Sequence, residues 1–335
     1  MDDVKYAKVH IPTANPFVLN DFKLGETPAL LKAELYLPAT AKPPFPAVVV
    51  NEGLGGVKHA RERRYGRFLA QNGCAALVVD SFGTRGYGKA PHPIRAINVT
   101  ESMMLADAFG SLTWLAARED VDSQRISNIG FSYGGMICIL TAYEQMRRHF
   151  VAGDEKFASH VSYYGPTVPR LVDYTTTGAP IAILNGKLDQ NFSPERLELI
   201  VEDLQNGGSA VENMVFDNVY HQWDSDDHER RFDRFNIQNL KTRIDPDNQI
   251  ISERSGNVIR GFTSRLALIA RAVSLSGFHL KRDAEIMAKT DALLLRYLKI
   301  RADETTPVGA TPSKDHPEAS EHLPPAGPTE ASAAV

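Results

Sequence analysis

A Gly-x-Ser-x-Gly motif at residues 130–134 restricts the fold of this chain more than any other segment. A short apolar run, residues 126–129, precedes the motif, and a helix-like run, residues 136–146, follows it. In this strand–turn–helix context the motif forms a nucleophile elbow, a turn so tight that the flanking positions must be glycine. The pattern predicts that Ser132 stands above the end of its strand as a nucleophile. An ordinary Gly-rich loop is the alternative interpretation.

An acid and a histidine follow this serine in the order that such a site uses. Asp189 lies just beyond the apolar run 181–185, and His221 lies just beyond the run 211–216. The carboxyl ends of parallel strands share one edge of a sheet, so we expect both side chains to meet Ser132 there. A serine hydroxyl is a weak nucleophile until an imidazole, oriented by a carboxylate, takes its proton.

Other acids and histidines fit the pattern less well. Asp189 itself has the alternative of a solvated loop residue. Neither Asp173 nor Asp217 follows a strand by the right few residues. His279 is the nearest rival to His221, but no predicted strand precedes it.

Two backbone amides are expected to stabilise an oxyanion beside Ser132. One belongs to Tyr133, the residue after the nucleophile. The other should come from the glycine-rich loop after the apolar run 46–51, where Gly53 and Leu54 are both candidates; a plain β-turn is the alternative. Glu52 in the same loop is a candidate for substrate binding, and its carboxylate can either hydrogen-bond the serine or cap the next helix, which is expected over residues 58–71.

Composition excludes several classes of function. The chain has 335 residues, 43% of them hydrophobic, which is enough for one large core. A net charge of −4 predicts no nucleic-acid partner, and no Cys/His spacing predicts a metal site or a cofactor. Cys74 and Cys138 lie in apolar runs, as core residues in a reducing compartment do. The polar start of the chain and the lack of a long apolar run predict a cytoplasmic protein without a membrane span.

Apolar strands alternate with helical patterns along the chain, which predicts an α/β fold with a mostly parallel eight-stranded sheet and helices on both faces. We expect a single domain over residues 1–300, with an inserted flap or subdomain at about 224–276. Residues 302–335 are rich in Pro, Ala, Ser, Thr and Glu, which predicts a disordered tail. The expected strands span residues 4–11, 31–37, 47–51, 74–79, 126–129, 160–164, 181–185 and 211–216, and the main expected helices 58–71, about 98 onward, 136–146, 194–206 and 283–299.

Over roughly residues 30–300 the chain resembles the dienelactone-hydrolase-like group of α/β-hydrolases. The resemblance rests on six segments: Glu52-Gly53-Leu54-Gly55, Val78-Val79-Asp80-Ser81-Phe82-Gly83, Gly130-Phe131-Ser132-Tyr133-Gly134-Gly135, Tyr163-Tyr164-Gly165, Gly186-Lys187-Leu188-Asp189 and Tyr220-His221-Gln222-Trp223. It implies hydrolysis of an ester or lactone through an acyl-enzyme, with no cofactor. The founding enzymes of the family use a cysteine where this chain has Ser132. They also have an arginine shortly after the catalytic histidine, where this chain is acidic.

The sequence thus predicts a serine-dependent carboxylic ester hydrolase that acts on a small-molecule ester or lactone. A peptidase or thioesterase on the same scaffold and a non-catalytic binding protein are the alternatives. The sequence is compatible with a homodimer. Four more residues are candidates for substrate contact. Arg85 could bind an anionic group, and Phe232 and Phe235 could line an acyl pocket. Trp223, two residues after His221 in the sequence, is the fourth. Their alternative is a purely structural role.

Overall fold

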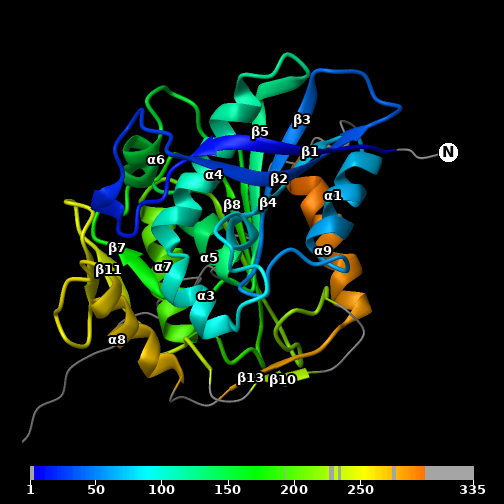
Figure 1. Cartoon of the computed structure of the whole chain (residues 1–335). Helices are drawn as coiled ribbons and strands as arrows, with labels where there is room; N and C mark the ends of the chain where they lie inside the picture. The colour runs from blue at the N-terminus through cyan, green and yellow to red at the C-terminus, as the bar shows by residue number, and fades with distance from the viewer. Residues whose placement is uncertain (1–3, 192, 226–229, 233–234, 274–276, 299–335) are drawn as a thin grey trace, which may run out of the picture.

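The computed structural model describes residues 4–298 except 192, 226–229, 233–234 and 274–276. Its centre is an eight-stranded sheet in the order β1-β2-β4-β3-β5-β6-β8-β9 (Figure 1). The first two strands are antiparallel, and the six from β4 to β9 run parallel to one another. This sheet confirms the predicted fold class. The strands are β1 (Val4–Thr13), β2 (Ala29–Pro38), β3 (Phe45–Asn51), β4 (Ala75–Asp80), β5 (Val121–Phe131), β6 (His160–Tyr163), β8 (Ile181–Gly186) and β9 (Val211–Phe216).

Helices cover both faces of the sheet because the central strands are apolar on both sides. In β3, Val48 and Val50 pack with α1 (Glu62–Gln71) and α9 (Ala284–Tyr297). The alternate residues Ala47 and Val49 belong to a second cluster on the opposite face. That cluster includes side chains of α4 (Glu101–Ala116), α5 (Tyr133–Leu140), α6 (Glu144–Phe150) and α7 (Pro194–Asn206). Figure 1 shows α1 and α9 together on one side of the sheet and α4, α6 and α7 on the other.

The segment between β4 and α4 holds more helix than its glycines and prolines suggest. Residues Ser81–Thr84 form the short helix α2, and His92–Asn98 form α3. The predicted start of the next helix at Asn98 is wrong. Asn98 ends α3, where its side-chain amide donates to the Ile94 carbonyl, and Thr100 caps α4 by accepting from the Met103 amide.

The helix expected over residues 136–146 is divided into α5 and α6. The break is caused by pairing with a distant segment: the Glu144 amide donates to the Thr175 carbonyl and the Thr177 amide donates to the Ala142 carbonyl. Thr141 closes α5 by donating its hydroxyl to the Cys138 carbonyl. No local sequence pattern predicts such a contact between distant segments.

Segment 224–276 holds β11 (Thr242–Ile244), β12 (Ile250–Ser252) and α8 (Phe262–Val273). The two strands form a small sheet with β7 (Pro169–Leu171). Another strand of the segment, β10 (Arg230–Phe232), pairs with β13 (Phe278–Leu280). In Figure 1, β11 lies at the left edge of the molecule beside β7, α8 lies at the lower left, and β10 and β13 lie at the bottom.

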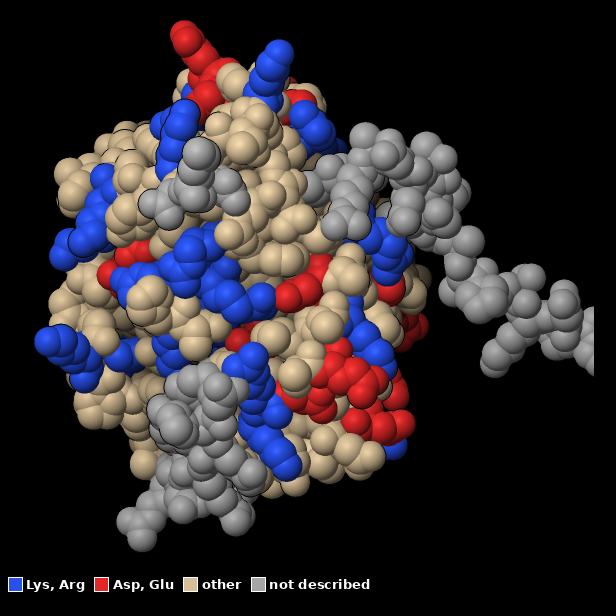
Figure 2. Space-filling model, turned by 90° about the vertical axis from the view of Figure 1, so that its right-hand side faces the viewer, with Lys and Arg blue, Asp and Glu red and all other residues tan. Residues whose placement is uncertain are grey.

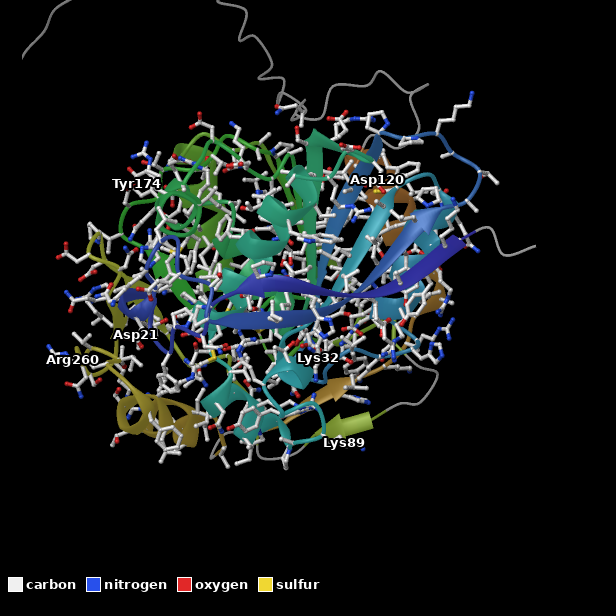
Figure 3. All side chains as sticks on the ribbon, turned by 45° about the horizontal axis from the view of Figure 1, so that its top comes forward. Asp21, Lys32, Lys89, Asp120, Tyr174 and Arg260 are labelled. Carbon is white, nitrogen blue, oxygen red and sulfur yellow. The ribbon has the colours of Figure 1, made fainter. Side chains whose placement is uncertain are left out.

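The outer surface carries charges of both signs. On the side where α1 and α9 lie, Lys and Arg side chains are next to a group of acidic ones (Figure 2). Side chains fill both sides of the sheet, while labelled residues such as Asp120, Tyr174 and Arg260 lie on loops at separate edges (Figure 3).

Both cysteines are free and buried, as predicted. Within the described residues, no helix combines the length and the apolar character that a membrane crossing requires. The predicted disordered tail, 302–335, lies outside the described residues.

Candidate active site

Ser132 occupies a sharp turn between β5 and α5. Its φ of 54° is unusual for a residue with a side chain. The neighbouring glycines are required by space: a Cβ on Gly130 would lie 2.0 Å from the Gly134 carbonyl oxygen, and one on Gly134 would lie 2.5 Å from the Asn51 carbonyl oxygen. The turn therefore has the elbow geometry that the motif predicts.

His221 lies between Ser132 and Asp189. Its Nε2 is 2.9 Å from the Ser132 hydroxyl oxygen, and its Nδ1 is 2.6 Å from Oδ2 of Asp189. The side chains of His221 and Asp189 are 1% and 0% exposed. The other oxygen of Asp189 accepts from the Asn191 amide at 2.8 Å. The three residues that the sequence singled out are thus brought together at one edge of the sheet.

The backbone of His221 is held by the chain that follows segment 224–276. The His221 amide donates to the His279 carbonyl at 3.3 Å, and the Lys281 amide donates to the His221 carbonyl at 3.2 Å. The Asp283 amide donates to the Trp223 carbonyl at 2.9 Å. The return of the chain through β13 therefore positions the histidine loop, a role that no sequence motif indicates.

Trp223 supports this loop from inside the core. It is fully buried, with its ring centroid 4.8 Å from that of Tyr164, and its indole N–H donates to the Thr290 hydroxyl. Trp223 thus packs in the core, and its contact with the substrate stays a prediction. Tyr164 packs edge-on against His221, with centroids 4.8 Å apart, and donates its hydroxyl to Asp224. Asp224, part of the acidic segment, thus faces inward, and burial raises its pKa even with Arg61 nearby.

A buried carboxylate organises the loop that was predicted to supply an oxyanion donor. Glu62 accepts from the Lys58 amide at 2.9 Å, from the Gly53 amide at 3.3 Å and from Nε of Arg61 at 2.8 Å. The side chains of Arg61 and Glu62 are both 0% exposed. Glu62 therefore ties the start of α1 to the loop beside Ser132.

The two candidate donors in this loop differ in their surroundings. Gly53 lies beside the nucleophile, since a Cβ on it would be 3.4 Å from Cβ of Ser132, but its amide donates to Glu62. Among the described residues, the amides of Leu54 and Tyr133 have no hydrogen-bond acceptor. Both Gly53 and Leu54 remain candidates for the second donor.

Glu52 caps a helix. Its Oε1 accepts from the Phe82 amide at the start of α2, at 2.8 Å, and its side chain is fully buried. Burial, together with the nearby Asp80, raises the pKa of Glu52 well above its ordinary value. Among the described residues Glu52 makes no hydrogen bond to Ser132, and it caps α2 instead of the next helix along the chain, α1, which the alternative expected.

Arg85 does not face the site. Its guanidinium forms a bidentate ion pair with Asp107, at 2.7 and 3.0 Å, and its side chain is 8% exposed. It also donates to the Asn15 side chain and the Ala14 carbonyl. This geometry contradicts both the anion-binding prediction and the surface alternative. The side chain is buried, and the guanidinium N–H groups that would bind an anion already donate to Asp107, Asn15 and Ala14.

Segment 224–276 contributes residues next to the elbow that sequence reasoning missed. Arg265 of α8 pairs with Glu101 at 2.8 Å and donates to the Tyr133 hydroxyl at 2.9 Å. The Tyr133 hydroxyl in turn donates to Glu101 at 3.0 Å. Burial raises the pKa of Glu101, but the charge of Arg265 and the hydrogen bonds from the backbone, Tyr133 and Arg265 together outweigh burial, so the pKa lies below its ordinary value. Phe235 is buried near this group, whereas the side chain of Phe232 lies outside the described part of the structure.

The described residues contain no group of three or more His, Cys, Asp or Glu side chains that could hold a metal ion. The chemistry that this geometry can perform is nucleophilic: a serine, a histidine within reach of its proton and a carboxylate behind the histidine.

Comparison with known proteins shows the family to which this chain belongs. The model of the dienelactone hydrolase family matches residues 31–242. The chain belongs to the dienelactone hydrolase family. A protein of Escherichia coli O157:H7 named "Putative carboxymethylenebutenolidase" is 28% identical over 197 residues, which cover 56% of this chain and 71% of that protein. The crystal structure of a "Putative Dienelactone Hydrolase" from Klebsiella pneumoniae subsp. pneumoniae MGH 78578 is 23% identical, covers 66% of this chain and 88% of its own, and has a TM-score of 0.53.

Membership confirms the family predicted from the sequence and defines the class of reaction. This member of the dienelactone hydrolase family is a carboxylic ester hydrolase that acts on esters or lactones. The match ends at residue 242, so most of segment 224–276, including α8, lies beyond it.

Proposed function

We propose that the protein hydrolyses its ester or lactone through an acyl-enzyme on Ser132, with His221 as general base and Asp189 as its orienting acid. The observation that carries this proposal is the position of His221, with one ring nitrogen on Ser132 and the other on Asp189. One nitrogen thus faces the hydroxyl whose proton it would take, and the other faces the carboxylate that would fix its tautomer.

The reaction then follows from these positions. Nε2 of His221 takes the proton as Oγ of Ser132 adds to the substrate carbonyl carbon. The amides of Tyr133 and of the Gly53–Leu54 loop stabilise the negative oxygen. Imidazolium returns the proton to the leaving alcohol, the carbon–oxygen bond breaks, and an acyl-serine remains. Water, deprotonated by His221, hydrolyses that ester and restores Ser132.

Ser132→Ala tests the proposal. The variant should lose ester hydrolysis by about 10⁴-fold or more, because no other group can form the acyl-enzyme. It should also fail to react with a fluorophosphonate probe while its circular dichroism stays that of the wild type. Ser255→Ala, at an exposed serine, serves as the control and should keep both activity and labelling. Near wild-type esterase activity in Ser132→Ala would refute the proposal.

A further inference from the structure

A small cavity lies against the residues that flank the nucleophile. Leu54 of the candidate oxyanion loop and Tyr133 of the elbow form part of its wall. Segment 224–276 supplies the opposite wall with Phe235, Ile237 and Leu240. These five residues are between 3% and 8% exposed, so bulk solvent reaches little of the wall that they form. The cavity thus touches the residue after Ser132 and one of the two candidate donors of the loop, which places it beside the expected position of a carbonyl group on Ser132.

The cavity is short. About 30 Å³ of it is open to the centre of a sphere the size of a water molecule. The free space therefore accommodates only a short alkyl group, of about one or two carbon atoms. Its lining is mainly apolar, which suits an alkyl group.

Part of the wall is a charged group that cannot easily move. Arg265, Glu101 and the Tyr133 hydroxyl form a closed cycle of contacts between 2.8 and 3.0 Å. Nε of Arg265 is also bound, to the Ala96 carbonyl at 2.8 Å. A longer alkyl chain that pressed into this group would separate a buried ion pair, which is strongly unfavourable.

We propose that this cavity receives the alkyl part of the acyl group and limits the enzyme to acyl groups of about two or three carbons. The inference rests on the proposed acyl-enzyme at Ser132. It gives segment 224–276 a direct role, because that segment forms one wall and, through Arg265, braces the residue after the nucleophile. Each methylene that does not fit should lower kcat/KM by about 10–200-fold.

The test compares kcat/KM for p-nitrophenyl acetate, propionate, butanoate and hexanoate in the wild type and three variants. Ile237→Ala enlarges the cavity and should raise the butanoate-to-acetate ratio by about tenfold or more. Ala96→Val narrows it and should lower the propionate-to-acetate ratio by a similar factor. Ile200→Ala is the matched control, since Ile200 is also a buried isoleucine but lies on α7 and does not line the cavity. It should lower the melting temperature without changing either ratio by more than about twofold.

The outcomes separate this inference from the function on which it rests. The acyl cavity would be overturned if the wild type cleaved hexanoate as fast as acetate. It would also be overturned if Ile237→Ala and Ala96→Val changed the two ratios no more than Ile200→Ala does. In either case, labelling of Ser132 by the fluorophosphonate would still support the acyl-enzyme. A wild type that neither cleaves these esters nor reacts with a fluorophosphonate would overturn both. If Ile237→Ala does not fold, Ala96→Val and the wild-type series still decide the question.

Discussion

Ser132 takes a left-handed backbone conformation because β5 must turn into α5 within one residue. Backbone atoms of β3, β6 and their following loops leave no room for a Cβ on Gly134 or Gly135, and the first turn of α5 itself leaves none on Gly130. The packing of neighbouring strands thus maintains the strain that presents the serine to His221. At this scale the site is a property of a few residues whose types and spacing are visible in the sequence.

The triad assignment predicts strongly non-additive mutations. His221→Ala removes the base, and Asp189→Asn removes the group that fixes its tautomer, so each should lower kcat by about 10⁴-fold. Once His221 is absent, Asp189 has nothing to orient, and the double variant should stay within about tenfold of His221→Ala. Initial rates with one chromogenic ester measure all three.

Asp217→Asn is the control, since this exposed acid pairs only with Lys187 in the described structure. It should keep the wild-type kcat. Losses that multiply in the Asp189→Asn/His221→Ala double variant would mean that the two residues act independently.

At the scale of elements, what the sequence could predict depended on whether the signal was local. The buried strands β3, β4 and β8 are continuous apolar runs in the sequence, and α7 spans residues 194–206 as predicted. The placement of Ser132, Asp189 and His221 followed from their positions after such strands. The break between α5 and α6 was missed because it depends on pairing with residues 175–177.

Charged residues outside motifs were also missed, for the same reason. Glu62, Glu101 and Arg265 are charged residues in helical segments, where a solvated side chain is the usual expectation. Only the folded chain brings Arg265 to Glu101, 164 residues away in sequence. The Arg85 prediction failed in the same way, because its partner Asp107 lies on another helix.

The buried pair Arg61–Glu62 gives a prediction that separates stability from activity. Glu62→Leu leaves Arg61 buried and unpaired, and should lower the free energy of unfolding by about 3–5 kcal/mol. The Arg61→Leu/Glu62→Leu double variant removes both charges and should recover much of that stability. It should still have a kcat about 10²-fold below the wild type, because the loop at Gly53 has lost its acceptor.

Urea unfolding and ester kinetics on the same preparations measure the two effects. Glu212→Ala, which breaks the more exposed pair with Arg296, should change stability by at most about 1 kcal/mol and leave kcat unchanged. Full recovery of kcat in the double variant would show that Glu62 does not position the loop.

At the scale of the whole molecule, buried titratable groups make stability depend on pH. Burial lowers the pKa of His160, which is fully buried, to about 3, and burial with Arg95 nearby lowers that of His92 to about 4. Both are neutral in the folded protein near pH 7. Glu52 and Asp224 shift the other way, since burial raises their pKa. The two histidines therefore destabilise the fold as the pH falls, and the two acids do so as it rises.

His160 provides the clearest test of this balance. Its ring is held at 3.3 Å from the Thr141 hydroxyl and stays neutral in the fold, while the unfolded chain takes up a proton below its ordinary pKa of 6.5. The unfolded state thus binds more protons between pH 6.5 and about 3, and stability is lost as the pH falls through that window. From about pH 8 to about pH 4.5 the loss from this one group amounts to about 2.7 kcal/mol.

His160→Gln removes this titration. The variant should be less stable than the wild type at about pH 8, because a packed ring is replaced, but its unfolding free energy should fall by about 2.7 kcal/mol less on going to about pH 4.5. All other groups titrate equally in both proteins, so the difference isolates His160. His10→Gln, at an exposed position of β1, should keep the wild-type pH dependence. Parallel stability curves for His160→Gln and the wild type in urea unfolding would show that His160 accepts its proton equally well in the folded and unfolded chain.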